Sequence, residues 1–356
     1  MRVVPTPIRV GFVGCGRIAR VHESYVSELP HVRLVAVCDV SEEAARAFAG
    51  RKEGVRWFGD FRSMLSAVEL DAVHVLTPPQ DHARTSLAAL EAGLHVLVEK
   101  PMALRVADAE RVVEVARRVG RSLVVDHNRK FDPPVRRVRA MVERGELGEI
   151  VGVEAFQGGA AEPGSTAPRG DWKGSLPAGP LEDVAPHPVY LLREFAGELR
   201  EPRVEARAGA AGLEEVRALA RGSRSLGTLS LSMSARPVLN GIRILGTRAT
   251  AEVDLNTMTL VVRRPRTLPK LLGKVVPNLE QAGQLLFSTV RNSVEYVRGR
   301  QRLYPGMGEL VRRFYLHLAA GSPPPTTPEE GLEVVAFLER MWELASGAPA
   351  AEQLCA

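Results

Sequence analysis

The feature that most constrains this chain is the alternation of apolar runs and helical patterns over residues 8–128. Nearly continuous apolar runs occur at 8–14, 34–39, 71–77, 95–100 and 122–128, and amphipathic stretches separate them. Such runs are typical of strands buried on both faces of a parallel sheet. Strands that alternate with helices form right-handed crossover units. We therefore expect an α/β fold with an N-terminal doubly wound parallel sheet.

A glycine-rich turn follows the first run. Gly14-x-Gly16-x-x-Ala19 ends the predicted strand and opens a helical stretch that starts near Arg17 and Ile18. Gly14 permits a tight turn, Gly16 lets the backbone approach a pyrophosphate, and Ala19 allows helix and strand to pack closely. The N–H groups of the helix N-terminus would bind the phosphates. The pattern predicts a Rossmann domain that binds a dinucleotide.

An acidic residue supports this prediction. Asp39 ends the second predicted strand, twenty-three residues after Gly16. A carboxylate at this place accepts hydrogen bonds from the adenosine ribose hydroxyls and repels a 2′-phosphate, so NAD is favoured over NADP. The alternative is a glycine turn without a ligand, with Asp39 at a solvated strand end.

The second half has a different pattern. After residue 127, strand-like segments with alternating polarity predict an α+β domain built on a large, open, mainly antiparallel sheet. These segments are 149–157, 203–210, 214–222, 225–235, 241–255 and 258–264. A capping box at 327–330 predicts a final helix that continues to about Ser346. We expect a Rossmann domain over 1–126 and a substrate-binding and oligomerisation domain over 127–350.

Two short motifs carry candidate chemistry. Glu99-Lys100-Pro101 ends a predicted parallel strand, where open α/β sheets bind ligands. Asp183 and His187 lie four residues apart, before an apolar run. A histidine suits removal of an alcohol proton, a lysine ammonium stabilises alkoxide charge, and a carboxylate orients the imidazole or a substrate hydroxyl. The alternative makes His187 a packed histidine; in both interpretations Asp183 caps a helix whose first turn contains His187.

Four segments of the sequence resemble the motifs of a known family: GFVGCGRIA, LTPPQDH, EAGLHVLVEKPMAL and PLEDVAPHP. In this order and spacing they resemble the Gfo/Idh/MocA family of NAD(P)-dependent oxidoreductases, over about residues 8–346. The resemblance implies a Rossmann domain and a substrate domain whose open sheet commonly serves in oligomer contacts. It also implies hydride transfer at a carbon of a sugar, cyclitol or related polyol.

The resemblance assigns roles to individual residues. It implies that Lys100, Asp183 and His187 form the catalytic site. From the chemistry above we assign His187 as the general acid/base, Lys100 as the oxygen polariser and Asp183 as the orienting group, although the first two roles can be exchanged. The expected cofactor-binding residues are Gly14, Gly16, Arg17, Ile18, Asp39, Thr77, Pro78, His82, Glu99 and Lys100. The expected substrate-binding residues are Lys100, Asn128, Arg129, Arg169, Trp172, Asp183 and His187. Where family members often have glycines, this chain has Ala178 and Ala185, which predicts a stiffer loop.

Residues 263–302 form a basic insertion. Nine cationic residues stand against Glu280 and Glu295, so its net charge of +7 exceeds the +5 of the whole chain. Residues 278–299 predict an amphipathic helix whose apolar face contains Leu279, Ala282, Leu286, Val290, Val294 and Val297. The favoured interpretation is a helix packed on the sheet or on another subunit, with solvated arginines. The alternative is a surface for anionic partners, either nucleotide-sugar phosphates or a membrane with lipid-linked sugars.

Composition limits the remaining classes. The chain has 356 residues, long enough for two domains, with 45% hydrophobic and 25% charged residues. No apolar run reaches membrane-spanning length and no leader precedes the first strand, so we expect a cytoplasmic protein. The cysteines, Cys15, Cys38 and Cys355, form neither a CxxC motif nor a disulfide framework, and we expect no metal site.

The leading hypothesis is an NAD-dependent dehydrogenase acting on the CH–OH group of a sugar, cyclitol or nucleotide-sugar. One alternative is an enzyme with a resident NAD that catalyses net isomerisation or elimination; another is a non-catalytic NAD(H)-binding sensor. We expect a small polyol or sugar substrate, free or linked to a nucleotide or lipid, and a homodimer or homotetramer. No nucleic-acid motif stands out, and peripheral membrane contact is the less favoured interpretation.

Overall fold

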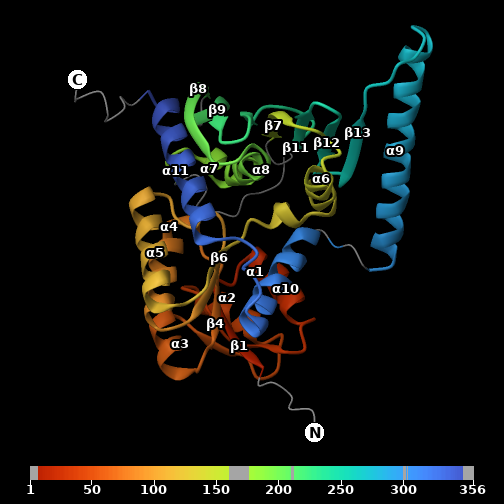
Figure 1. Cartoon of the computed structure of the whole chain (residues 1–356). Coiled ribbons are helices and arrows are strands. Elements are labelled where there is room, and N and C mark those ends of the chain that lie inside the picture. The colour runs from red at the N-terminus through yellow and green to blue at the C-terminus, as the bar shows by residue number, and fades with distance from the viewer. Residues whose placement is uncertain (1–6, 160–175, 210–211, 300–301, 303, 348–356) are drawn as a thin grey trace. The chain divides into compact units, whose positions relative to one another are not determined.

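The structure is a computed structural model that describes residues 7–159, 176–209, 212–299, 302 and 304–347. Contacts within the chain define two units. The first contains Met1–Asn128 and Gly306–Val335, and the second contains Arg129–Pro305 and Ala336–Ala356. Each unit has its own sheet, as Figure 1 shows.

The first unit contains a six-stranded parallel sheet with the strand order β3-β2-β1-β4-β5-β6. Its strands are β1 (Ile8–Val13), β2 (Val32–Cys38), β3 (Arg56–Phe58), β4 (Ala72–Val75), β5 (His95–Val98) and β6 (Leu123–Val125). Helices cover both faces (Figure 1). They are α1 (Arg17–Val26), α2 (Glu42–Ala49), α3 (Phe61–Ala67), α4 (Pro79–Glu91) and α5 (Val106–Val119). This order is that of the Rossmann fold, as the sequence predicts.

Local sequence explains how these elements begin and end. The side chain of Ser41 accepts a hydrogen bond from the N–H of Ala44 at the start of α2, and Asp60 does the same for Ser63 at the start of α3. Gly120 ends α5 with a φ of +63°, a left-handed conformation that glycine adopts without strain. Because the strands between these helices are buried on both faces, the unit has a continuous apolar core.

Helix α10 and the first part of α11, from near the end of the chain, belong to the first unit. Helix α10 spans Pro305–Ala320, and α11 spans Pro328–Ala345, starting at the predicted capping box. Phe314 and Tyr315 of α10 pack their rings against His74 of β4. Residues 306–335 therefore group with the first unit, although the sequence analysis assigned them to the second domain. The other domain limits stay predictions.

The second unit contains a seven-stranded sheet with the order β13-β12-β11-β7-β10-β9-β8, in which only β7 and β10 run parallel. Its strands are β7 (Ile150–Gly158), β8 (Leu199–Gly209), β9 (Gly212–Gly222), β10 (Leu226–Ser232), β11 (Leu239–Gly246), β12 (Thr250–Asp254) and β13 (Thr259–Arg263). Its helices are α6 (Pro133–Glu143), α7 (Pro180–Val184), α8 (Pro186–Ala196) and α9 (Leu272–Val297), after the 3-10 turn η1 (Asn128–Phe131). The predicted, mainly antiparallel sheet is confirmed.

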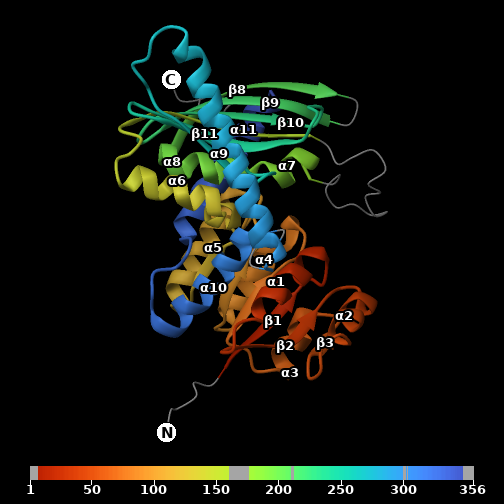
Figure 2. The ribbon, with the colours of Figure 1, turned by 90° about the vertical axis from the view of Figure 1, so that its right-hand side faces the viewer.

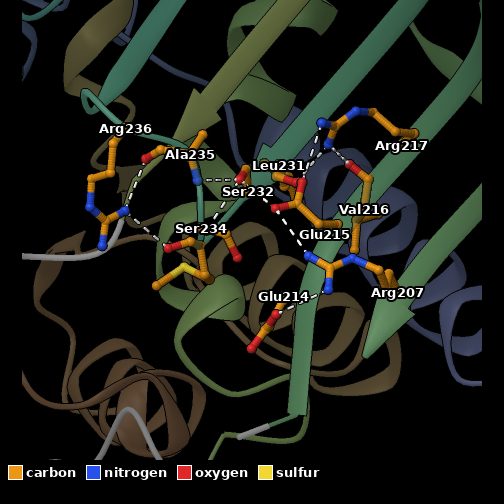
Figure 3. A network of polar contacts seen from close by, with 11 residues as sticks. Arg207, Glu214, Glu215, Val216, Arg217, Leu231, Ser232, Ser234, Ala235 and Arg236 are labelled. Atoms are coloured by element: carbon orange, nitrogen blue, oxygen red, sulfur yellow. Dashed lines mark hydrogen bonds and ion pairs between the residues drawn. The ribbon is translucent and has the colours of Figure 1, made fainter. Parts of the chain in front are cut away.

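The two faces of this sheet differ. Helix α8 packs against β7, β10 and β11, and Figure 2 shows α6 and α8 on the same side of the strands. The opposite face carries charged side chains as well as the exposed Leu219 and Leu226, and Figure 3 shows a cross-strand network there around Glu215. Its carboxylate accepts from Ser232 at 2.6 Å and pairs with Arg217 at 3.2 Å and Arg207 at 3.9 Å. Register places Arg207, Glu215 and Ser232 in one row across β8, β9 and β10.

Candidate functional site

The glycine turn of the first unit has the geometry of a phosphate-binding loop. Gly14 has a φ of +101°, and a Cβ added there would lie 2.5 Å from the carbonyl oxygen of Leu76, so only glycine fits. Gly16 is exposed, and a Cβ there would meet nothing within 4 Å. Gly16 is also the N-cap of α1 and supplies no side chain to its N–H groups. The turn therefore presents backbone N–H groups beside open space, which suits a pyrophosphate.

Asp39 braces this turn. Its Oδ2 accepts the N–H of Cys15 at 2.8 Å, and its Oδ1 accepts the N–H of Ser41 at 2.9 Å. The carboxylate is half-buried, and each oxygen retains acceptor capacity for a ribose hydroxyl. The same residue thus holds the glycine turn and stands where a dinucleotide ribose would bind. The residues present fit NAD.

Cys15 and Cys38 line the same turn but are buried. Burial raises the pKa of each thiol to about 12, so both are protonated at neutral pH and are poor nucleophiles and metal ligands.

His82 connects two loops at the carboxyl edge of the sheet. Its ring nitrogens lie 2.7 Å from the carbonyl oxygen of Thr77 and 2.6 Å from that of Pro101. Burial lowers the pKa of His82, and the hydrogen bonds to the two carbonyl oxygens oppose this shift. The hydroxyl of Thr77 is buried and has no hydrogen-bond partner among the described residues. The Thr77 hydroxyl therefore remains available for a hydrogen bond at the predicted cofactor loop, which Thr77 and Pro78 form together.

Glu99 and Lys100 follow β5. Glu99 is 8% exposed, and its Oε2 accepts the backbone N–H of Lys100 at 3.2 Å, while Lys100 itself is half-buried. The Lys100–Pro101 peptide bond is cis. Glu99 therefore fixes the backbone that carries Lys100.

Glu99 belongs to a buried ionic cluster with His22 and Asp126. His22 Nε2 is 3.4 Å from Glu99 Oε1 and 3.3 Å from Asp126 Oδ2, and all three side chains are buried. Burial alone would lower the pKa of His22, but the hydrogen bonds and charges of Asp126 and Glu99 raise it to about 9. Burial and the neighbouring charge of Glu99 raise the pKa of Asp126. His22 is thus an imidazolium between two carboxyl groups.

The cluster continues from His22 to His74 and Tyr315. His22 Nδ1 lies 2.9 Å from His74 Nδ1, and His74 Nε2 lies 2.8 Å from the hydroxyl of Tyr315. Burial and the charge of His22 lower the pKa of His74, so His74 is neutral. Of the described residues, only His22, Glu99 and Asp126 form a group with metal-ligand spacing, and ion pairing within the group accounts for it.

His187 lies in the first turn of α8, as the sequence predicts. Its Nδ1 is 2.9 Å from the hydroxyl of Tyr190, which also accepts the backbone N–H of Arg129 at 3.1 Å. Tyr190 is 1% exposed and lies three residues after His187 on the same helix. When Nδ1–H donates to Tyr190, the imidazole is in the tautomer whose Nε2 carries the lone pair that can accept a proton. Sequence analysis missed Tyr190, although the His-x-x-Tyr spacing on one helix face is its signal.

The prediction that Asp183 caps the helix of His187 is wrong. Asp183 lies inside the short helix α7, and the N-cap of α8 is Ala185, with φ −59° and ψ −34°. Because Ala185 keeps a helical conformation, the chain passes from α7 to α8 without the extended residue that side-chain capping needs. The neighbouring Glu182 is buried, and its Oε2 accepts the N–H of Ala178 at 2.9 Å.

An ion-pair cluster holds α8 in place. Lys130 is 5% exposed, and its Nζ lies 2.9 Å from Glu194 Oε2. Arg139 of α6 pairs with the other oxygen of Glu194. Burial opposes ionisation of Glu194, but Lys130 and Arg139 hold its pKa below the usual range. This cluster connects α8 to η1, which contains Asn128 and Arg129. Sequence analysis missed the cluster because ion-pair partners that are distant in the sequence leave no local pattern.

The predicted site residues are divided between the units. The glycine turn, Asp39 and Lys100 lie in the first unit, and so does Asn128. Arg129, Asp183 and His187 lie in the second unit. Arg169 and Trp172 lie outside the described residues.

Comparison with known proteins agrees with the fold. Residues 8–127 match the model of an oxidoreductase family with an NAD-binding Rossmann fold, and residues 135–252 match a C-terminal domain model of that family. The chain is 38% identical to D-glucoside 3-dehydrogenase of Escherichia coli over 146 residues, 41% of this chain and 42% of that protein. It is 30% identical to dTDP-3,4-didehydro-2,6-dideoxy-alpha-D-glucose 3-reductase of Streptomyces violaceoruber over 258 residues, 69% of this chain and 72% of that protein.

Solved structures share the fold over nearly the whole chain. The WlbA dehydrogenase from Bordetella pertussis, in complex with NADH and UDP-GlcNAcA, has a TM-score of 0.80 at 24% identity, covering 97% of each chain. By contrast, the chain spans only about two fifths of curated relatives such as the Escherichia coli enzyme.

The fold, the glycine turn and the match over residues 8–127 place the chain in a class described as oxidoreductases with an NAD-binding Rossmann fold. More particularly, the chain belongs to the Gfo/Idh/MocA family, because models of both family domains match it over residues 8–127 and 135–252.

Proposed function

We propose that this protein is an NAD-dependent dehydrogenase that transfers hydride between the nicotinamide and a secondary alcohol or ketone carbon of a sugar, cyclitol or nucleotide-sugar. The observation that carries the proposal is the uncapped glycine turn braced by Asp39, in a chain that also has the lysine and histidine of the family motifs. The names of the relatives support the substrate class, because they include a D-glucoside 3-dehydrogenase and a dTDP-sugar 3-reductase.

When bound at the glycine turn and Asp39, NAD would supply the hydride acceptor or donor of the proposed reaction. His187 takes the hydroxyl proton at Nε2 while Tyr190 holds Nδ1. Lys100, whose backbone is fixed by Glu99, stabilises negative charge on the substrate oxygen. Asp183 binds a substrate hydroxyl or orients the imidazole. Asn128 and Arg129 contribute polar contacts to the substrate, and Asp39 selects NAD by repelling a 2′-phosphate.

The test is the near-ultraviolet absorbance of reduced nicotinamide. The protein is incubated with NAD or NADP and a panel of free sugars, inositols and nucleotide-sugars. We expect NAD to be reduced with one substrate class. The rate of reduction should fall about a hundredfold or more in Lys100→Ala and in His187→Ala, because each substitution removes an electrostatic or acid–base group. If His187→Ala turns over substrate as fast as the wild type, His187 is not the general acid/base.

The same assay separates the proposed dehydrogenase from a resident-cofactor enzyme. If NAD(H) remains bound after purification and the sugar is converted without net change in absorbance, the protein oxidises and re-reduces its substrate. Tight NAD binding with no conversion of any substrate would instead favour a sensor.

A further inference from the structure

Helix α9 is attached to the sheet of the second unit by its polar face. Gln284 Nε2 donates to the carbonyl oxygen of Val262 at 3.0 Å, and the Val262 N–H donates to Gln284 Oε1 at 2.8 Å. One helical turn further on, Ser288 is only 2% exposed, and after another turn Asn292 donates to two carbonyls of the β12–β13 turn. Figure 1 shows α9 beside the edge strand β13. Gln284 thus occupies backbone groups that an edge strand leaves unpaired.

The apolar face of α9 is exposed on the opposite side of the helix. Side chains at steps of three, four and seven residues share one face of a helix. Six residues follow such steps, and we call this set the outer stripe: Leu272, Leu279, Gly283, Leu286, Val290 and Val297. All six are exposed. The predicted amphipathic helix therefore packs on the sheet through polar side chains, and its apolar face faces outward.

The charged side chains of α9 lie on the sheet side of the helix. Two cations and two acidic residues give the helix a net charge of zero: Lys274, Glu280, Arg291 and Glu295. Each stands four, seven or eleven residues from Gln284 or Gln281, and both glutamines contact β13. A helix that lies on an anionic membrane presents lysine and arginine to the headgroups. The outer stripe is instead the uncharged half of a neutral helix, which fits an uncharged apolar partner.

The outer stripe is symmetric about the middle of the helix. The steps between its successive members are seven, four, three, four and seven residues, so the stripe reads the same in both directions. An antiparallel second copy, with a two-fold axis at the level of residues 284 and 285, therefore places every member opposite another member. The facing pairs are Gly283 with Leu286, Leu279 with Val290, and Leu272 with Val297. Self-complementarity of this kind is what a two-fold interface requires.

Gly283 gives independent support for a closely packed partner. A glycine inside a helix is about 1 kcal/mol less favourable than alanine. A Cβ added to Gly283 would meet nothing within 4 Å, so no contact within the chain requires glycine at this position. In the antiparallel pair, Leu286 of the second copy would fill this space, because helices interdigitate when small residues face large ones.

The size of the exposed apolar face also suits a second copy. Its apolar side chains are between 39% and 85% exposed: Leu272, Val275, Leu279, Leu286, Phe287, Val290, Val294 and Val297. Together they present on the order of 800 Å² on each copy, which is about what one partner contributes to a standard interface. The area is therefore sufficient for a stable pair.

The charges distinguish the two possible orientations of such a pair. An antiparallel copy brings Lys274 to the level of Glu295, where the charges are opposite. A parallel copy brings Lys274 to the level of the same residue, where the charges repel. Charge and stripe symmetry therefore favour the same antiparallel arrangement.

We propose that α9 pairs in antiparallel orientation with α9 of a second copy of this chain, through the outer stripe. The interface is two-fold symmetric, with the polar face of each helix remaining on its own β13. The pair does not use the open face of the seven-stranded sheet. This inference does not depend on the proposed reaction.

The first test is the mass of the full-length protein in analytical ultracentrifugation. Leu286→Glu would bring two carboxylates close to the two-fold axis, and we expect it to halve the mass of the wild-type particle. Leu316→Glu is the matched control: Leu316 is an exposed leucine on α10, and its substitution should leave the mass unchanged. A monomeric wild type, or a Leu286→Glu variant with the wild-type mass, would overturn the proposal.

The second test reports the orientation and needs no charged substitution. In a Cys355→Ala background, in which Cys15 and Cys38 are buried, Leu279→Cys with Val290→Cys places cysteines opposite each other. Oxidised glutathione should then link most of the protein into a dimer on a non-reducing gel. Either single variant should stay unlinked, because antiparallel pairing holds identical cysteines about 16 Å apart, beyond the reach of a disulfide.

Two results of these experiments would identify a different partner or orientation. Efficient linkage in the single variants would show a parallel pair and overturn the antiparallel arrangement. Flotation of the wild type with phosphatidylcholine vesicles, abolished by Leu286→Glu without a change in mass, would show that lipid covers the outer stripe and would overturn the pairing itself.

Discussion

Tyr190 is the residue whose contacts bear most directly on the proposed proton transfer. Its hydroxyl contacts both His187 Nδ1 and the backbone of Arg129, so it fixes the imidazole relative to η1. We expect Tyr190→Phe to lower kcat by about tenfold with a smaller change in KM, because imidazole orientation acts on the proton step. The pKa seen in the pH profile of kcat/KM should also move. A variant with reduced kcat but an unchanged profile would show that Tyr190 is only structural.

The ionic cluster of His22, Glu99 and Asp126 predicts a pH-dependent stability. The pKa of His22 is about 9 in the folded protein and 6.5 as its ordinary value. The charged imidazole therefore stabilises the fold fully below pH 6.5, and this contribution is lost as pH rises through 9. The shift corresponds to roughly 3 kcal/mol, since one pKa unit is about 1.4 kcal/mol.

Urea unfolding between pH 6 and 10 measures this contribution. The free energy of unfolding of the wild type should fall over this range more steeply than that of His22→Gln. The raised pKa of Asp126 acts in the same direction at lower pH, because the fold favours its protonated form. Asp126→Asn should remove the slope near pH 7, and it should also reduce the slope near pH 9, because the hydrogen bond and charge of Asp126 help to raise the pKa of His22. Parallel curves for the wild type and His22→Gln would contradict the prediction.

At the scale of elements, α9 should behave as an appendage. Its contacts to β13 are polar and few, and its apolar residues contribute nothing to a core. We expect Gln284→Ala to make residues 264–299 sensitive to protease while the melting temperature of the rest changes by less than about 2 °C. Gln281→Ala is the matched control, because Gln281 accepts a hydrogen bond from the side chain of Arg263 rather than from the backbone of β13. A large drop in melting temperature would instead make α9 part of the core.

How far sequence predicts an element depends on what its pattern encodes. The parallel strands and the antiparallel sheet were predictable because apolar period and turn residues are local. The position of α10 was not, because an amphipathic pattern says that one face is buried without saying against which sheet. The same limit explains α9, where the apolar face is exposed and Gln284 makes the contact. It also explains the wrong prediction that Asp183 caps a helix, since that role depends on the backbone conformation of Ala185, which is helical.

The candidate site shows the same division. Gly14, Asp39, Lys100 and His187 stand in local motifs, so they could be identified from spacing. The side chains that hold them in place could not, since His22 contacts Glu99 across 77 positions, and sequence alone gives no pairing at that separation. Contacts of this kind become visible only when the fold is known.

At the scale of the whole molecule, α11 should couple the two units thermodynamically. The helix begins in the first unit, where Val335 joins the apolar core, and continues into the second as one uninterrupted segment. NAD bound to the first unit should therefore shift a single unfolding transition, by about 2.7 kcal/mol at a hundredfold excess over Kd. Calorimetry with and without NAD measures the shift, which NADP should produce more weakly because of Asp39.

A substitution inside α11 tests the coupling itself. Ala336→Pro interrupts the helix where the units divide, at a cost of about 3 kcal/mol or more. We expect this variant to unfold in two transitions, of which NAD moves only one, whereas the control Arg340→Ala keeps the single transition. Two transitions in the wild type would mean that α11 does not couple the unfolding of the two units. NAD would then stabilise only the unit that binds it. Coupling through one helix would let the cofactor stabilise a unit that supplies His187 but no dinucleotide turn.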